Sequence, residues 1–278
     1  MRQLLHVSDL HFGPHHLPPV AEGVRALVAE RRPDLVVISG DLTQRAKPHQ
    51  FRAARAFVDR LEGELGVATL TVPGNHDVPL YRIWERLLAP YGAYRAHFAA
   101  ELEPEHEDEE MVVIGLNTAY NWTLKDGRIG RRQRRALAAR LAAVPAGKAK
   151  IVVMHHHLVP APRYDNQRVL KGAWETVDLL AAHGVELVLG GHQHQTYVAS
   201  SEAYYPSGRP PVWLIHAGTT TSARGRGCER RRNTCNWIRL DERRLEVSHL
   251  GWDEQERRFA VWSRHRFPRR RHGELDAT

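Results

Sequence analysis

The hydrophobic pattern of the chain alternates between two forms. Short runs rich in Val, Ile and Leu predict buried β-strands at residues 4–8, 35–39, 67–72, 151–154 and 185–189. Longer segments repeat apolar residues every three or four positions and predict amphipathic helices, most clearly at residues 20–31 and 51–65. Strands and helices in alternation indicate parallel pairing with right-handed crossover connections. We therefore predict an α/β fold.

The rest of the chain departs from this alternation. Residues 81–100 predict one or two helices with a break at Pro90, and a buried strand and a helix are predicted at 111–116 and 131–143. The acidic stretch 101–110 is most simply a solvated loop. Four further strands are predicted without helices between them, at residues 212–216, 234–240, 244–252 and 258–263. Strands joined directly by turns pair antiparallel, so we expect them to complete a second sheet packed on the first.

Length and charge set the expected domain organisation. A chain of 278 residues is near the upper limit for one hydrophobic core, so we predict one domain over residues 1–263 and a flexible basic tail over residues 264–278. The net charge is +8, and residues 224–278 contain 15 Arg and 9 Asp or Glu, a difference of +6. Such a segment could bind nucleic acid or an anionic membrane surface, although a solvated Arg-rich surface is the simpler interpretation. A homodimer is a further partner to consider.

Composition points to a soluble globular protein. Hydrophobic residues make up 42% and charged residues 26% of the chain, and no apolar run approaches the ~18–20 residues that span a bilayer. The apolar stretch after Arg2 is cut by Ser8 and Asp9, which makes it too short for a signal peptide. We therefore expect a cytoplasmic protein. The two cysteines, Cys228 and Cys235, lack a companion pair for a zinc knuckle, so we interpret them as reduced structural thiols.

Polar residues follow five of the predicted strands at the point where each strand ends. The clusters are Asp9-Leu10-His11, Gly40-Asp41, Gly74-Asn75-His76-Asp77, His155-His156-His157 and Gly191-His192-Gln193-His194. Strands that deliver such residues at their carboxyl ends build a site at one edge of a sheet, where open α/β proteins bind ligands. The clusters offer imidazole, carboxylate and amide donors but no thiolate, a set that suits Mn, Fe, Zn or Co. The pattern therefore predicts a transition-metal site.

In this order, the five clusters resemble the five motif blocks of the calcineurin-like metallophosphoesterases. Each block alone would match many proteins by chance, but five in order, with every ligand type present, are specific. The resemblance covers residues 4–194, and residues 217–221 and 233–238 are similar to the end of the bacterial cyclic-nucleotide phosphodiesterase branch. It implies a four-layer α-β-β-α sandwich with two mixed sheets, and the order of predicted elements is compatible with that fold.

The resemblance also implies a centre of two transition-metal ions. Its ligands would be Asp9, His11 and His194 for the first ion, Asn75, His155 and His192 for the second, and Asp41 as a bridge between them. A bridging carboxylate is needed because two dications ~3.5–4 Å apart repel each other. The resemblance further implies that a hydroxide bridging the two ions is the nucleophile, which attacks phosphorus in line.

His76 is our candidate for the general acid. Its neighbour Asn75 occupies the implied ligand position, and adjacent side chains can diverge, so His76 can lie outside the metal shell near the leaving oxygen. Asp77 would then fix its tautomer. The alternative is a structural histidine that is hydrogen-bonded in a turn.

Two residues are candidates for substrate contacts. In an extended segment His157 shares a face with the implied ligand His155, whereas His156 points away. The triplet leaves open which histidine is the ligand, although the resemblance implies the first. Asn117 follows the predicted strand at 111–116 and suits a loop on the site side.

The favoured function is hydrolysis of a phosphodiester, either a cyclic nucleotide or a similar small substrate. Two other enzymes stay open: a nuclease, which the basic tail favours, and a nucleotide-sugar-lipid pyrophosphatase, which membrane binding by residues 264–271 would favour. A non-catalytic interaction module is the third alternative, and the intact ligand set argues against it. No Arg or Lys after the His triplet is an obvious clamp for a doubly charged phosphate, so we expect diesters to react faster than monoesters. Substrate discrimination is expected in the loops at 118–130 and 160–171.

Overall fold

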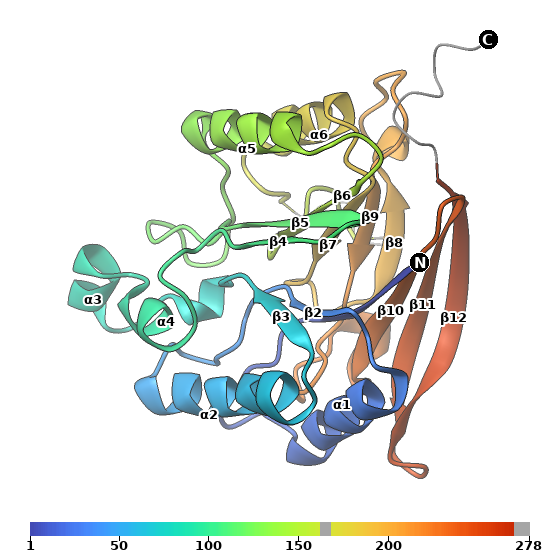
Figure 1. Ribbon diagram of the computed structural model, residues 1–278. Helices are drawn as coiled ribbons and strands as arrows, with labels where there is room; N and C mark the ends of the chain where they lie inside the picture. Colours follow the sequence, from blue (N-terminus) through green and yellow to red (C-terminus); the bar gives the residue numbers. More distant parts are fainter. Residues whose placement is uncertain (162–167, 270–278) are drawn as a thin grey trace.

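The computed structural model describes residues 1–161 and 168–269. Two six-stranded sheets face each other, and helices cover the outer face of each sheet, so four layers follow in the order α-β-β-α (Figure 1). Each sheet contains both parallel and antiparallel strand pairs. The predicted fold class is confirmed.

The first sheet has the strand order β12-β11-β10-β1-β2-β3. Its strands are β1 (Arg2–Val7), β2 (Leu35–Ile38), β3 (Ala68–Thr71), β10 (Thr234–Leu240), β11 (Arg244–Asp253) and β12 (Arg258–Pro268). Strands β1, β2 and β3 are parallel, and helices α1 (Pro18–Arg31) and α2 (Pro48–Asp59) connect them. The apolar stripes of both helices, which include Val24 and Phe51, are buried in one core with the outer face of this sheet.

The second sheet has the order β4-β5-β6-β7-β9-β8. Its strands are β4 (Glu105–Glu107), β5 (Met111–Leu116), β6 (Ala149–Met154), β7 (Leu187–Gly190), β8 (Tyr197–Ser200) and β9 (Trp213–His216). Helices α5 (Arg131–Ala143) and α6 (Ala173–Ala182) connect β5 to β6 and β6 to β7. Leu141 and Val177 belong to the core between these helices and the sheet.

The remaining helices are short. Helices α3 (Ile83–Leu88) and α4 (Gly92–His97) flank Pro90, where the sequence predicts a break. A π-helical segment, η1 (Arg60–Glu64), extends α2, and 3₁₀ turns form η2 (Asn75–Asp77), η3 (Ser201–Ala203) and η4 (Gly227–Glu229). Within the described part of the chain, every helix is too short or too polar to cross a bilayer.

A third core lies between the two sheets. Successive side chains of a strand point to opposite faces, and in β1 both faces are apolar: Leu5 is packed in the core with α1 and α2, and Leu4 in the core between the sheets. Val37 on β2 and Val153 on β6 lie in the same inter-sheet core as Leu4. Burial on both faces explains the continuous apolar runs in the sequence, and it leaves the polar chemistry to the strand ends.

The final strands correct two predictions. Strands β10 to β12 do not complete the second sheet; β10 pairs antiparallel with β1 and extends the first sheet. Strand β1 is central and buried, so its edge away from β2 needs a hydrogen-bonding partner, and β10 supplies it. The sheet also continues past the predicted domain boundary, because β12 ends at Pro268 rather than at residue 263. Residues 270–278 of the expected tail lie outside the described part.

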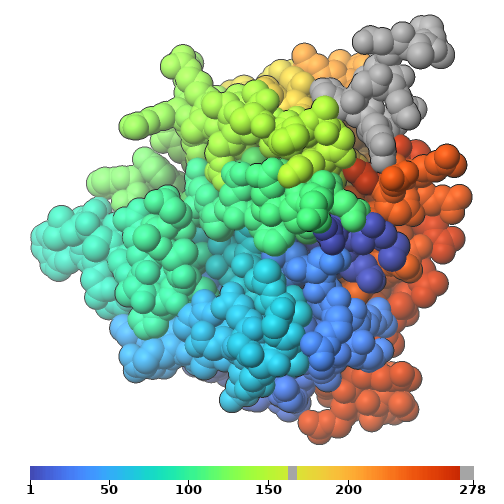
Figure 2. All heavy atoms as spheres, in the orientation of Figure 1, coloured from blue at the N-terminus to red at the C-terminus, as the bar shows by residue number. Residues whose placement is uncertain are grey.

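The acidic stretch 101–110 is more ordered than a solvated loop. It contains β4, and the N-terminal ammonium group of Met1 lies 2.8 Å from Glu110 Oε2. Arg2 adds ion pairs with Asp108 and Glu109. Figure 2 shows the first residues, in dark blue, between this green segment and the orange-red C-terminal strands.

Candidate metal centre

The predicted site residues lie on loops at the carboxyl ends of parallel strands from both sheets. These loops follow β1, β2 and β3 in the first sheet and β6 and β7 in the second. Hydrogen bonds join neighbouring loops within each sheet, from Asp9 N to Gly40 O at 3.1 Å and from Gly191 N to His155 O at 3.0 Å. A hydrogen bond of 2.9 Å from His192 N to Asp9 Oδ2 connects the two sheets. The facing sheets thus bring the five clusters to one place.

Five of the seven predicted ligands have a left-handed backbone conformation, which is uncommon for residues other than glycine. The φ angles are 52° at Asp9, 47° at His11, 52° at Asp41, 72° at His192 and 54° at His194. Each such residue costs on the order of 1–3 kcal/mol, and backbone strain of this kind clusters at functional sites. The loops are therefore shaped for a ligand rather than for packing alone.

The first half-site consists of Asp9, His11 and His194. His11 Nε2 and His194 Nε2 are 3.1 Å apart, and Asp9 Oδ1 lies 3.5 Å from the former and 3.0 Å from the latter. His194 Nδ1 donates a hydrogen bond of 2.5 Å to the carbonyl oxygen of Arg224, which orients the ring and leaves Nε2 as the free donor atom. Three potential ligand atoms therefore converge.

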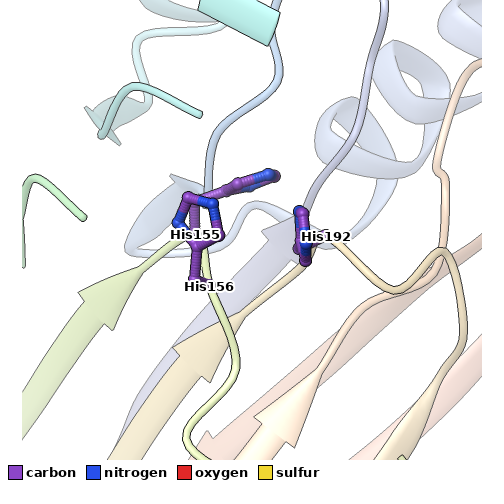
Figure 3. Close-up of side chains that lie close together, drawn as sticks. All are labelled: His155, His156 and His192. Carbon is purple, nitrogen blue, oxygen red and sulfur yellow. The ribbon is translucent and has the colours of Figure 1, made fainter. Parts of the chain in front are cut away.

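The second half-site consists of Asn75, His155 and His192. Asn75 Oδ1 lies 3.2 Å from His155 Nε2 and 3.0 Å from His192 Nδ1. His155 Nδ1 donates to the carbonyl oxygen of Ser39 at 2.9 Å, so Nε2 faces the half-site. Figure 3 shows His155 and His192 on neighbouring segments, with His156 beside His155.

Asp41 lies between the two half-sites. Its Oδ2 atom is 3.7 Å from His11 Nε2 in the first half-site and 3.3 Å from His155 Nε2 in the second. Its Oδ1 atom accepts a hydrogen bond of 2.8 Å from His76 N, which holds the carboxylate in this orientation. One carboxylate oxygen is thus close to both sets of donor atoms.

The protonation states of these residues suit metal binding. Burial raises the pKa values of Asp9 and Asp41, but the surrounding histidines outweigh it and hold both pKa values well below the usual range. Burial lowers the pKa of His11 to about 4 and holds the pKa of His192 well below its usual value. Ionised carboxylates and neutral imidazoles are the forms that bind metal ions. His155 differs: burial lowers its pKa, but the charges of Asp41 and Asp9 and the hydrogen bonds to Asp41 and Ser39 together outweigh burial and raise the pKa to about 9. Metal binding at His155 would therefore release a proton.

One buried atom lacks the partner that a cation would supply. Asp9 Oδ1 is buried and accepts no hydrogen bond from the residues the structure describes. His194 Nε2 is near it but carries no proton when Nδ1 donates to a carbonyl. A buried, unpartnered carboxylate oxygen is costly, whereas a metal ion bound by Asp9, His11 and His194 would satisfy it. The residues present therefore fit a transition-metal centre.

The calcineurin-like phosphoesterase family matches the chain over residues 2–196, which include all seven predicted ligands. The chain belongs to this family. A protein of Synechococcus sp. named "Probable cyclic nucleotide phosphodiesterase" is 31% identical over 183 residues, 65% of each chain. A cAMP/cGMP dual specificity phosphodiesterase of Mycobacterium tuberculosis is 28% identical over 203 residues, 69% of this chain and 61% of the relative. The match therefore spans less than two thirds of either relative.

The fold is shared with solved structures at much lower sequence identity. A dimetal phosphatase from Danio rerio superimposes with a TM-score of 0.63 at 13% identity, over 94% of this chain and 98% of the phosphatase. At that identity the likeness concerns the fold alone. The two mixed sheets and their helices are thus those of a metallophosphoesterase.

The hydrogen-bond partners of His76 and Asp77 differ from those predicted from the sequence. His76 Nδ1 donates to the carbonyl oxygen of Gln44 at 2.8 Å, so Gln44 orients the ring and the role predicted for Asp77 is wrong. The Asp77 carboxylate accepts hydrogen bonds from Leu42 N, Thr43 N, Thr43 Oγ1 and Gly74 N, at 2.8–3.1 Å. Asp77 therefore ties the loop after β2 to the loop after β3, and adjacency in sequence gave no sign of this.

The His triplet also differs from the expectation for an extended segment. Strand β6 ends at Met154, so strict alternation does not continue through the triplet. His156 does not point away: its ring centre is 4.6 Å from that of His192, and its Nε2 is buried without a hydrogen bond to any described residue. His157 contacts Gln193 Nε2 at 2.8 Å through Nδ1. His155, His156 and His192 thus form one group of imidazoles. The structure, like the sequence, therefore leaves open which histidine of the triplet is the ligand.

The two substrate candidates occupy different surroundings. The ring of His157 stacks on that of His192 with centres 5.7 Å apart, so it adjoins the second half-site. Asn117 Oδ1 instead accepts a hydrogen bond of 3.0 Å from Ala119 N, so this oxygen is engaged within its own loop. Residues 162–167 of the predicted specificity loop lie outside the described part.

Sequence reasoning overlooked Arg224. Its Nη1 atom lies 3.2 Å from His76 Nε2 and 3.3 Å from both ring nitrogens of His11. The sequence offered no obvious arginine or lysine clamp for a phosphate, whereas the structure places Arg224 beside His11 and His76. The only signal was position, because Arg224 closely follows residues 217–221, which resemble the family, and it is 213 positions from His11.

Two glycines allow the loops to approach each other. A Cβ atom on Gly74 would lie 2.2 Å from Asp41 Oδ1, and one on Gly191 would lie 1.8 Å from Ser8 Oγ and 2.5 Å from Asp9 Oδ2. Real Cβ contacts are never this short, so a side chain at either position would displace a predicted ligand. The glycines flanking the motifs are thus part of the site's geometry.

Proposed function

We propose that the chain is a metal-dependent phosphodiesterase with two transition-metal ions, acting on a small phosphodiester. The observation that carries the proposal is the position of Asp41 Oδ2, near His11 of one half-site and His155 of the other. A carboxylate in this place reduces the repulsion between two cations, which lets one centre hold both.

A cyclic nucleotide is the substrate that we place first. Two relatives carry names that include cyclic nucleotide, cAMP or cGMP phosphodiesterase, and they match 65% and 69% of this chain. The identities of 31% and 28% support the reaction type more strongly than the substrate. The substrate is therefore a matter for direct assay.

Each residue of the centre has a proposed task. Asp9, His11 and His194 hold one metal ion, Asn75, His155 and His192 hold the other, and Asp41 bridges them. When bound, such a pair of ions acts as a Lewis acid on the phosphoryl group and lowers the pKa of water. The carbonyl groups of Ser39 and Arg224 keep two of the ligand imidazoles in the required tautomer.

His76 is the proposed proton donor to the leaving oxygen. Its Nδ1 is engaged by the Gln44 carbonyl, so Nε2 is the ring atom that faces the centre. His76 N also donates to Asp41 Oδ1, which places the residue directly beside the bridging carboxylate. With both ring nitrogens protonated, a histidine held in this way gives its Nε2 proton to the leaving oxygen, keeps its Nδ1 proton on the Gln44 carbonyl and does not move its backbone.

A turnover panel tests this proposal. Purified protein supplied with Mn²⁺ is assayed on 3′,5′- and 2′,3′-cyclic nucleotides, bis(p-nitrophenyl) phosphate, p-nitrophenyl phosphate, single-stranded DNA and a nucleotide-sugar lipid, and again after metal removal by EDTA. We expect metal-dependent hydrolysis of a cyclic nucleotide and of the aryl diester. Hydrolysis of DNA alone would indicate a nuclease, and release of a nucleotide from the lipid would indicate a pyrophosphatase. If the protein hydrolyses none of the substrates, it is an interaction module.

A further inference from the structure

The Arg224 side chain lies at the centre, and the proposed reaction gives it no task. Its guanidinium group is half-buried, and Nη1 lies within 3.3 Å of the rings of His11 and His76. Burial lowers the pKa of Arg224, and the charges of Asp41 and Asp9 oppose that effect. An arginine stays protonated in proteins, so a positive charge is held at the edge of the metal centre.

The backbone around Arg224 is anchored to the loop that carries Asp9 and His11. Thr220 N donates to Ser8 O at 2.9 Å, Thr219 Oγ1 to Asp9 O at 2.8 Å and Thr221 Oγ1 to Leu10 O at 3.0 Å. Ala223 N then donates to His15 O at 2.9 Å, and the carbonyl oxygen of Arg224 itself accepts from His194. Hydrogen bonds before Arg224 and at its own carbonyl group thus fix the residue, and its side chain is directed at the centre.

The guanidinium group lacks the partner that usually accompanies a half-buried arginine. Among residues 1–161 and 168–269, no carboxylate oxygen forms an ion pair with Arg224, and its contacts are to imidazole nitrogens through Nη1. Its other donors, Nε and Nη2, have no hydrogen-bond partner within the described part. Guanidinium donors pair best with anionic oxygens in a planar, two-pronged arrangement. The free donors therefore suit an anion that the structure does not contain.

We propose that Arg224 binds a non-bridging oxygen of the substrate's phosphoryl group. This inference rests on the proposed function and adds an anion subsite beside the metal half-sites. A phosphoryl oxygen is a stronger acceptor for Arg224 than a neutral imidazole, so it replaces His76 Nε2 as the partner of Nη1. His76 Nε2 then turns to the leaving oxygen. Negative charge grows on the phosphoryl oxygens during in-line displacement, and a fixed guanidinium group stabilises it.

The subsite is tested with Arg224→Ala and Arg224→Lys, and with Arg226→Ala as the matched control. Arg226 is exposed and lies two residues away, so its substitution by alanine removes the same charge from the same loop. The first readout is the dissociation constant for inorganic phosphate, measured by calorimetry on the Mn²⁺-loaded proteins, together with metal content by elemental analysis. The second is kcat and KM for bis(p-nitrophenyl) phosphate and p-nitrophenyl phosphate.

We expect Arg224→Ala to keep two metal ions and to bind phosphate about 10-fold to 100-fold more weakly, the range for a lost hydrogen bond to a charged group. Its kcat/KM falls by a similar factor, and more for the doubly charged monoester than for the diester. Arg224→Lys recovers part of the loss, because a point charge lacks the planar fork. Arg226→Ala behaves like the wild type within about twofold, because solvent screens an exposed charge.

Two results overturn the inference. If Arg224→Ala binds phosphate and turns over both esters as well as Arg226→Ala does, no such subsite exists. If Arg224→Ala loses metal ions, the residue supports His11 and His194 instead of an anion. Failure of the proposed function is a separate outcome: wild type then hydrolyses no diester, whereas phosphate binding still reports on Arg224.

Discussion

At the scale of single residues, the geometry of the centre depends on the hydrogen bond that the second polar atom of each proposed ligand makes. His155 and His194 use Nδ1 for a carbonyl oxygen and present Nε2, whereas His192 presents Nδ1 to Asn75. Asp41 divides its two oxygens between the half-sites and the His76 backbone. Because His155, His194 and Asp41 are held by hydrogen bonds to the backbone, a conservative substitution there removes a donor atom without rearranging the loop. Single substitutions are therefore informative at this site.

Asp41→Asn is expected to reduce the metal content from two ions to one or none. An amide keeps the shape of the side chain but not the negative charge that two cations share, so we expect turnover to fall by about 10³-fold, which corresponds to the loss of several kcal/mol of stabilisation. Elemental analysis and turnover measure the two effects. Asp59→Asn, on the exposed face of α2, serves as the control. A wild type with one metal ion, or an active Asp41→Asn protein, would refute the dinuclear proposal.

His76→Ala is expected to keep both metal ions and to slow hydrolysis according to the leaving group. General acid catalysis contributes ~10²–10⁴-fold, so the loss approaches that range for a cyclic nucleotide, whose leaving group is a basic alkoxide. The loss is much smaller for a nitrophenyl diester, because nitrophenolate departs unaided. Single-turnover rates are needed so that product release does not mask chemistry, and exposed His49→Ala is the control. Equal losses on both substrates would assign His76 to phosphate positioning.

At the scale of elements, the loops after β2 and β3 behave as one unit. The Asp77 carboxylate accepts hydrogen bonds from both loops. Gly74 lets the two loops approach so closely that Asp41 occupies the space where a Cβ atom on residue 74 would lie. Gly74 has φ −102°, so its requirement for glycine is steric rather than conformational. The unit places the Asp41 carboxylate and Asn75 in one rigid arrangement.

Gly74→Ala is therefore expected to damage the centre although alanine is the smallest side chain. Its Cβ would lie 2.2 Å from Asp41 Oδ1 and 2.3 Å from Asp41 N, and relief of that overlap requires the backbone to shift. We expect loss of metal and a fall in unfolding free energy of about 1–3 kcal/mol, measured by elemental analysis and urea denaturation. Gly63→Ala is the control, because a Cβ there meets nothing within 4 Å, and stability should change by no more than about 1 kcal/mol. Equal stability and metal content in both variants would show that the loops adapt.

At the scale of the whole molecule, a buried polar network connects the two sheets. Asn236 on β10 donates through Nδ2 to His6 Nδ1 on β1 and to the carbonyl oxygen of His216 on β9, both at 3.1 Å. Its Oδ1 accepts from His249 Nδ1 on β11 at 2.6 Å. A single side chain thus satisfies groups on three other strands. Arg266 and Arg269, expected in a free basic tail, instead pair with Glu246 and Glu186.

Asn236→Ala is expected to lower the free energy of unfolding by about 2–4 kcal/mol. The substitution leaves buried groups of His6, His216 and His249 without partners, and each unsatisfied buried polar group costs about 1–3 kcal/mol, partly offset by relaxation. Urea denaturation monitored by tryptophan fluorescence measures the change. Gln255→Ala, in an exposed turn, should stay within about 0.5 kcal/mol of the wild type. A change at Asn236 no larger than that of the control would show that the network contributes little.

The sequence by itself determined the type and order of most elements and the residues from which the centre is built. Burial on both faces produces unbroken apolar runs, and polar clusters at their ends, such as Gly74-Asn75-His76-Asp77, stand out because the strands need no polar residues. These are local signals, since each depends on a few consecutive residues. The ligand roles of the seven residues stay a proposal, but their positions in one place follow from the structure.

Only the tertiary structure decided what depends on contacts between distant segments. Strands β10 to β12 joined the first sheet because the free edge of β1 needed a partner, and no local pattern states which edge a strand will meet. Gln44, rather than adjacent Asp77, orients His76, because the fold returns a carbonyl group to the ring from 32 residues away. Arg224 reaches His11 from 213 residues away, because threonine hydrogen bonds align its loop with β1. Partners at such separation are chosen by packing and hydrogen bonding in three dimensions, which a one-dimensional pattern does not encode.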